Sequence, residues 1–181
     1  CADGVQRTAE ARSVDGLRWE VRPGAVSDTT YLRVFRHGGR THALARGGEV
    51  LAAREDGTFE GGHRPFDPTH RHAGLLLRGD KLHVLWTRIG DSPERILQST
   101  IDLRGDWRGW RVKGAREVLR PERPWEGTDA PLLPTPVGSA HGRENGLRDP
   151  FLFDDVDGAL WLVYAAAGES NLCLARVVAG L

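Results

Sequence analysis

Residues 149–177 read DPFLFDDVDGALWLVYAAAGESNLCLARV, and this stretch decides the fold. A short apolar run, Phe151–Phe153, is followed by an acidic turn that contains Asp157 and Gly158. Two further apolar runs come next, Ala159–Ala166 and Asn171–Val178, separated by a glycine-containing loop. Because Gly and Asp tolerate the positive φ that tight hairpins need, the stretch predicts three antiparallel strands joined by short turns.

The same order of features occurs twice more along the chain. The segments are YLRVFRHGGRTHALARGGEVLAARE from position 31 and AGLLLRGDKLHVLWTRIGDSPERILQSTI from position 73. Each has an apolar strand, a tight polar turn, a second strand, a glycine loop and a third strand. The strands predicted outside the opening stretch are Leu17–Arg22, Tyr31–Arg36, Thr41–Ala45, Val50–Arg54, Ala73–Arg78, Lys81–Thr87, Arg95–Ile101 and Trp107–Val112.

Tryptophan-containing segments are predicted to add fourth strands to these sets. DWRGWRV, 106–112, would close the second set, and SVDGLRWEV, 13–21, resembles a closing strand whose own set lacks its beginning. Repeated four-stranded antiparallel units predict an all-β fold of the β-propeller type, with an ordinary β-sandwich as the alternative. We treat 1–181 as one domain: part of a larger propeller, or a propeller that is open or completed by oligomerisation.

Composition excludes several classes of function. The 25 basic residues balance 25 acidic ones, so a nucleic-acid partner is not expected. No apolar run has the length of a membrane span and no secretory signal is visible, so we expect no membrane association and favour the cytoplasm. Cys1 and Cys173 form neither a metal-ligand spacing nor a disulfide framework, and Cys173 is predicted to be a small core residue. We expect a bacterial source.

Asp149 stands at the mouth of a predicted buried strand, directly after a loop rich in Pro and Gly that spans 113–147. The first strand of each propeller sheet lines the central axis, so an acid at its start faces the funnel where ligands bind. Pro150 is tolerated at the first residue of a strand. Arg148 could pair with Asp149 or bind a ligand hydroxyl or carboxylate.

RDPFLFDDVDGALWLVYAAAGESNLCLARV and SVDGLRW resemble segments of the five-bladed propeller glycoside hydrolases, the clan of arabinanases, β-xylosidases, invertases and levansucrases. The resemblance covers most of the chain as a strand pattern and is strongest in the last unit. It implies a five-bladed propeller, of which this chain holds about three blades and a remnant. It also implies a carbohydrate ligand at the funnel.

The resemblance implies that Asp149 stabilises the transition state or orients the substrate. Glycosidic hydrolysis needs two further carboxylates, one of them a proton donor. The best available candidates are Glu126 and Glu144 in the long loop, although neither matches a family motif, and Asp67-Pro68 stands between units. Three functions stay open: a glycosidase, a non-catalytic propeller module that binds a sugar or another protein, and a piece of a longer protein.

Three other residues are candidates for sugar contact. Arg71 and His72 occupy nearly the position of Arg148 and Asp149 in the preceding unit, although the histidines there could simply end a strand. Trp125 could stack on a sugar ring or anchor its loop. His63, His70 and His72 lack carboxylate partners for a metal, so no metal or other cofactor is expected. Glu94 and Arg95 fit a solvated turn.

Overall fold

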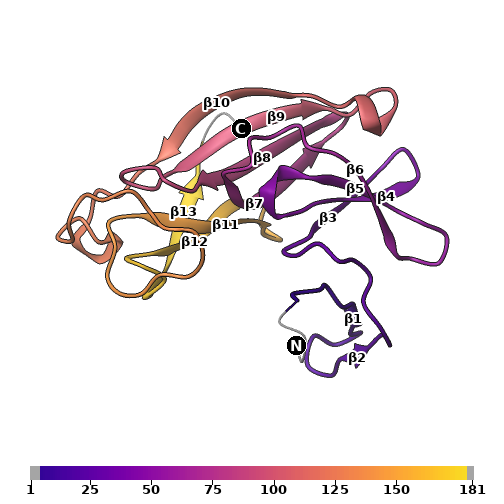
Figure 1. The fold of residues 1–181 in the computed structure, drawn as a ribbon, viewed down its shortest axis with the longest axis horizontal. Coiled ribbons are helices and arrows are strands. Elements are labelled where there is room, and N and C mark those ends of the chain that lie inside the picture. The colour runs from indigo at the N-terminus through magenta and orange to yellow at the C-terminus, as the bar shows by residue number, and fades with distance from the viewer. Residues whose placement is uncertain (1–4, 179–181) are drawn as a thin grey trace.

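Three antiparallel sheets follow one another along the chain in the computed structural model, which describes residues 5–178 (Figure 1). The first sheet contains β3 (Arg33–His37), β4 (Arg40–Leu44), β5 (Val50–Ala53) and β6 (Phe59–His63). The second contains β7 (His70–Arg78), β8 (Lys81–Arg88), β9 (Ile96–Asp102) and β10 (Val112–Leu119). The third contains β11 (Leu147–Asp154), β12 (Leu160–Ala166) and β13 (Asn171–Val177). The predicted all-β class is confirmed.

The N-terminal segment forms a small hairpin of its own, β1 (Ala11–Arg12) with β2 (Glu20–Val21). The carboxylate of Asp15 accepts hydrogen bonds from the backbone N–H groups of Leu17 and Arg18, both at 2.9 Å, and this fixes the turn. The predicted strand Leu17–Arg22 is therefore mostly turn. Its strand part pairs with β1 and does not close any of the three sheets (Figure 1). Cys1 lies outside the described residues.

Apolar side chains join the sheets face to face. One core cluster lies between the first and second sheets and includes Leu44, Val50, Trp86 and Trp107. A second cluster joins the second and third sheets, and Cys173 packs against it as a partly buried residue. Burial of these faces is the main favourable contribution to the fold.

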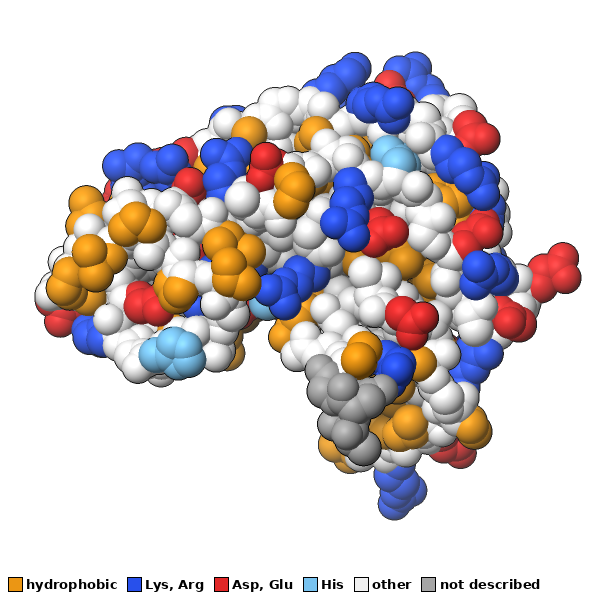
Figure 2. Space-filling model, viewed as in Figure 1, with side chains coloured by type: hydrophobic (Ala, Val, Ile, Leu, Met, Phe, Trp, Pro, Cys, Tyr) orange, Lys and Arg blue, Asp and Glu red, His pale blue; other side chains and the backbone are white. Residues whose placement is uncertain are grey.

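The first strands of the three sheets lie next to one another. The Nε–H of Arg33, at the start of β3, donates to the carbonyl oxygen of Ala73 in β7 at 2.8 Å. A Cβ on Gly74 of β7 would come within 2.9 Å of the Pro150 carbonyl oxygen in β11, so only glycine allows this approach. Figure 1 shows β3, β7 and β11 meeting near the middle of the molecule, and Figure 2 shows the surface hollowed beside them.

The segment 106–112 is not the strand that its pattern predicted. It contains a 3-10 helix, η2 (Trp107–Gly109), because the Asp106 side chain accepts a hydrogen bond from the Arg108 N–H at 2.8 Å and starts a turn. The fourth strand of the second sheet is β10, which occupies the first part of the predicted loop 113–147. Its mostly exposed side chains give no alternation to detect. β6 was also missed, since its two glycines have low β-propensity.

The rest of the long loop, 120–146, packs against the third sheet. It contains the 3-10 helix η3 (Pro124–Glu126), while a third such helix, η1 (Arg46–Gly48), connects β4 and β5. A Cβ on Gly127 would lie 2.1 Å from the Glu144 carbonyl oxygen. Another on Gly168, in the β12–β13 turn, would lie 1.9 Å from the Gly142 carbonyl oxygen. These close backbone contacts fix the loop beside the start of β11.

The third sheet has one covered face and one exposed face. Leu152, Leu162 and Tyr164 pack against the second sheet. On the opposite face Phe151 and Phe153 are each 47% exposed, Leu174 is 60% exposed and Leu172 is 80% exposed. Among residues 5–178, no helix has the length and apolar character needed to cross a membrane.

Candidate functional site

Tyr31, His72 and Asp149 come together where the first strands of the three sheets, β3, β7 and β11, begin. We call these N-terminal ends the strand mouths. Tyr31 and His72 precede the two-residue hairpin turns of their sheets by the same number of residues. Asp149 lies in the bulge of β11, as His72 lies in the bulge of β7. The Nδ1 of His72 is hydrogen-bonded to Oδ1 of Asp149. The Tyr31 ring lies against the His72 ring with 4.2 Å between centroids. Each sheet thus supplies one side chain to a continuous row.

Backbone irregularities occur at all three of these residues. The pairing of β7 with β8 is interrupted between His70 and Ala73, and that of β11 with β12 between Arg148 and Phe151. Asp149 has a φ of 52° and Tyr31 a φ of 57°, in the left-handed region that non-glycine residues rarely occupy. Bulges and left-handed residues concentrate where a side chain must be aimed at a ligand.

Asp149 is ionised by its surroundings. Burial acts to raise the pKa of its carboxyl group, but the hydrogen bond and charge of His72 act in the opposite direction. The positive charges of Arg148 and Arg71 add to this, and the net result is a pKa below the usual value. With side-chain exposures of 18% for His72 and 34% for Asp149, both groups can still meet a ligand.

Arg71 and Arg148 are not placed to contact a sugar, contrary to the prediction. Both are buried, 3% and 2% exposed, and both donate from Nε to the carboxylate of Glu94, at 2.8 and 3.0 Å. The other guanidinium nitrogens of Arg71 donate to the carbonyl oxygens of Pro136 and Gly138. Those of Arg148 pair with Glu144 and with Glu169. All three nitrogens of both guanidinium groups donate to acceptors within the protein, and both groups are buried away from a ligand.

The two loop glutamates also differ from the predicted role of proton donor. Glu126 is 4% exposed: its Oε1 accepts from the Tyr164 hydroxyl at 2.6 Å and its Oε2 accepts from the N–H groups of Glu122 and Arg123. Glu144 is bound to Arg148. Both carboxylates therefore anchor the long loop, which explains why acids stand there without a family motif.

Trp125 is exposed, with 57% of its surface accessible, next to Glu126 in η3. Its carbonyl oxygen accepts from the side-chain amide of Asn171, the first residue of β13. The pairing of β11, β12 and β13 puts Asn171 at the same end of the third sheet as Leu147, near the start of β11. Trp125 is thus on the mouth side of the sheet, but two strands away from the first strand.

Tyr31 is the residue that sequence reasoning missed. It was predicted as part of a strand, whereas β3 begins at Arg33 and Tyr31 is 47% exposed just before it. The only signal for it was its alignment with His72 relative to the hairpin turns. An exposed aromatic face beside polar groups suits the C–H face of a sugar ring.

Other clusters in the described part of the chain are less suited to a ligand. Burial lowers the pKa of His70 to about 4, and its ring packs between Phe66 and Trp86, so it is a neutral core residue. His63 is bonded to the Trp110 carbonyl oxygen. Within residues 5–178 no three His, Cys, Asp or Glu side chains are grouped to hold a metal ion.

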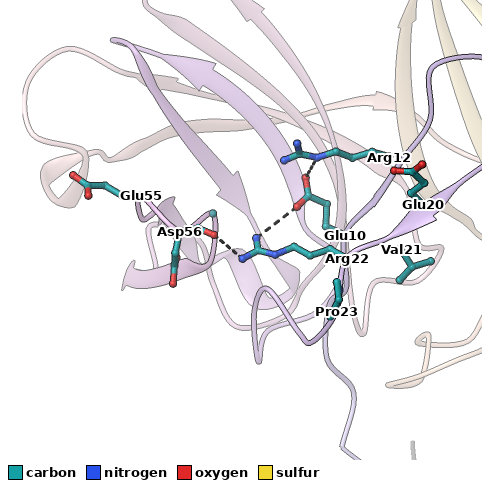
Figure 3. A pocket seen from close by; sticks show the side chains of 9 residues that line it. Glu10, Arg12, Glu20, Val21, Arg22, Pro23, Glu55 and Asp56 are labelled. Atoms are coloured by element: carbon teal, nitrogen blue, oxygen red, sulfur yellow. Dashed lines mark hydrogen bonds and ion pairs between the residues drawn. The ribbon is translucent and has the colours of Figure 1, made fainter.

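A cavity of about 490 Å³ lies between the β1–β2 hairpin and the β5–β6 turn (Figure 3). Its charged groups are largely paired with one another. Glu10 pairs with Arg12 at 2.7 Å and with Arg22 at 3.6 Å, while Arg22 donates to the Asp56 carbonyl oxygen at 2.6 Å. This cavity does not include the Tyr31, His72 and Asp149 row.

The sequence matches no protein-family model. An uncharacterised protein of Acanthamoeba polyphaga mimivirus is 36% identical over 184 aligned positions, which include 92% of this chain and 51% of that protein. The chain thus spans about half the length of the curated relative that it matches. Because this relative is viral, the expected bacterial source receives no support.

Two solved structures of Cellvibrio cellulosa α-L-arabinanase resemble the fold. The structure complexed with arabinohexaose has a TM-score of 0.53 and 15% identity, over 88% of this chain and 59% of that chain. The other has a TM-score of 0.50 and 16% identity, over 90% of this chain and 60% of that chain. The arabinanase is a β-propeller, so the three sheets have a propeller-like arrangement.

Proposed function

We propose that this chain is part of a five-bladed propeller and binds a glycan at the mouths of β3, β7 and β11. The observation that carries the proposal is the hydrogen-bonded pair of His72 and Asp149, which lie in corresponding bulges of two adjacent first strands. Asp149 retains Oδ2, and His72 retains Nε2, to hydrogen-bond sugar hydroxyls. Tyr31 offers an aromatic face beside them, and Trp125 is proposed as an outer contact.

Binding is better supported than hydrolysis for this chain alone. A glycosidase uses two carboxyl groups on opposite sides of the scissile bond. The third sheet supplies a carboxylate to the row, Asp149. The other two sheets supply His72 and Tyr31, which have no carboxyl group. Glu94, Glu126 and Glu144 are engaged with arginines, a tyrosine and backbone amides. A complete catalytic set would therefore need carboxylates from outside residues 5–178.

Calorimetric titration tests this proposal. The ligands are arabinohexaose, which the similar arabinanase binds, and oligosaccharides of xylose, fructose, galactose and mannose, with aryl glycosides as probes of turnover. We expect saturable binding of at least one glycan without turnover, weakened tenfold or more by Asp149→Asn and by His72→Ala. Each substitution removes a group that contacts the sugar directly.

Asp154→Asn is the matched control, because Asp154 ends the same strand and is exposed, paired with Arg78 at 2.9 Å. It should leave the affinity unchanged. The proposal fails if no glycan gives a saturable heat, or if the Asp149 and Asp154 variants behave alike. Turnover that Asp149→Asn abolishes would instead assign a glycosidase.

A further inference from the structure

Glu94 is a buried carboxylate in the connection between β8 and β9. It is 0% exposed, although its position beside Arg95 predicted a solvated turn. Moving a carboxylate out of water is costly unless it is paired and hydrogen-bonded. Its backbone is also held, since its carbonyl oxygen accepts from the Leu147 N–H at 2.9 Å.

The two oxygens of Glu94 bind two arginines from different sheets. Oε1 accepts from Nε of Arg71 at 2.8 Å, and Oε2 accepts from Nε of Arg148 at 3.0 Å. Arg71 directly precedes His72, and Arg148 directly precedes Asp149. One carboxylate therefore connects side chains of β7 and β11 whose residues directly precede the two residues of the candidate site.

Bonds to the remaining guanidinium nitrogens fix both arginines. Arg71 also donates to Pro136 and Gly138 in the long loop, at 2.6 and 2.7 Å. Arg148 also pairs with Glu169 in the β12–β13 turn, at 2.8 Å. All three nitrogens of each guanidinium group donate hydrogen bonds, so neither arginine side chain can rotate without breaking charge-assisted hydrogen bonds. Glu94 thus links the two arginines that directly precede His72 and Asp149.

We propose that Glu94 is the positioning residue of the glycan site, and this inference rests on the proposed function for the role of His72 and Asp149. It holds the bulge that contains Arg71 and His72 at a fixed position relative to the bulge that contains Arg148 and Asp149. The His72 imidazole and the Asp149 carboxylate are therefore hydrogen-bonded before a ligand binds. A site prepared in this way avoids the cost of ordering its groups during binding.

Nitrogen NMR of the His72 ring tests the inference without any glycan. In the wild-type protein, the Nδ1 signal should show a hydrogen bond to Asp149, with assignment by comparison with His72→Ala. Glu94→Gln keeps the shape of the side chain and removes its charge. We expect this variant to fold, to lose the hydrogen-bonded Nδ1 signal and to bind the glycan at least tenfold more weakly.

Glu60→Gln is the matched control, because Glu60 also pairs with two arginines, Arg40 at 2.8 Å and Arg108 at 3.4 Å, and neither belongs to the bridge through Glu94. It should retain the His72 signal and the affinity. If Glu94→Gln does not fold, Arg71→Lys tests the same inference. Lysine keeps the positive charge but lacks the guanidinium group that binds Glu94 and the long loop together.

The inference is overturned if a folded Glu94→Gln or Arg71→Lys variant retains the wild-type His72 signal. A wild-type protein that shows this signal but binds no glycan would refute the proposed function and leave the positioning role of Glu94 supported.

Discussion

At the scale of single residues, hydrogen bonding divides the charged groups near the strand mouths into two kinds. Glu94, Arg71, Arg148 and Glu126 are buried and bonded within the protein, so they support the architecture. Asp149 and His72 have one bond to each other and remain partly exposed. Charge alone does not distinguish these kinds, because it is burial and the partners of each group that decide whether a ligand can use it.

Tyr164→Phe tests the structural role of Glu126. The tyrosine hydroxyl donates to this buried carboxylate at 2.6 Å, and burial, followed by the bond to Glu126, raises the pKa of Tyr164. A hydrogen bond to a charged group contributes about 1.5–3 kcal/mol, so the variant should lose about that much stability in urea unfolding. Unchanged stability would contradict the assignment of Glu126 as a loop anchor.

Stability should also fall in mild acid because of two buried histidines. Burial is the main reason that the pKa of His42 and that of His70 are both lowered to about 4, from an ordinary value of 6.5. The unfolded chain therefore binds protons that the folded protein does not, between about pH 6.5 and 4. Each histidine should reduce the free energy of unfolding by up to about 1.4 kcal/mol per pH unit as the pH falls.

Urea unfolding at several pH values across this range measures the effect. His70→Phe keeps an aromatic ring between Phe66 and Trp86 and removes one titrating group. Its free energy of unfolding should fall less steeply with decreasing pH. A slope equal to that of the wild type would show that His70 does not contribute.

At the scale of elements, the first strands are brought together by a glycine and two bulges. Gly74→Ala would push a Cβ against the backbone of Pro150 and Phe151, at 2.9 to 3.2 Å. Overpacking of this kind costs about 1–3 kcal/mol, and it should separate β7 from β11 and weaken glycan binding. Gly109→Ala has open space and is the control for thermal unfolding and calorimetry. Equal behaviour of the two variants would contradict this packing.

Sequence patterns predicted the elements better than the site. Apolar runs and Gly or Asp turns located β4, β5, β8, β12 and β13 to within a few residues, because their alternation and turn chemistry are local. β6 and β10 lacked that alternation. Asp149 and His72 were indicated by their place at strand starts. Glu94 and Tyr31 were not, because their roles depend on partners from other sheets.

At the scale of the whole molecule, the third sheet leaves an apolar surface uncovered. Register places Phe151, Phe153, Leu172 and Leu174 on one face, and the other face of the same sheet is packed against the second sheet. An exposed apolar face of this kind favours association. A second copy of this chain would be suited to cover it.

Sedimentation velocity tests whether this face drives association of the chain. We expect concentration-dependent self-association of the wild type, and a monomer for the double variant Leu172→Lys with Leu174→Lys. Leu133→Lys changes an equally apolar residue, 63% exposed in the long loop, and should leave association unchanged. A wild type that stays monomeric at every concentration would contradict the prediction.

We propose that the row of Tyr31, His72 and Asp149 receives a glycan. A crystal structure of the protein with the tightest-binding oligosaccharide of the panel tests this. We expect a sugar ring with hydroxyls bonded to Asp149 and His72 and one face against Tyr31. A sugar bound elsewhere, for example in the cavity beside Glu10 and Arg22, with no ligand at the strand mouths, would contradict it.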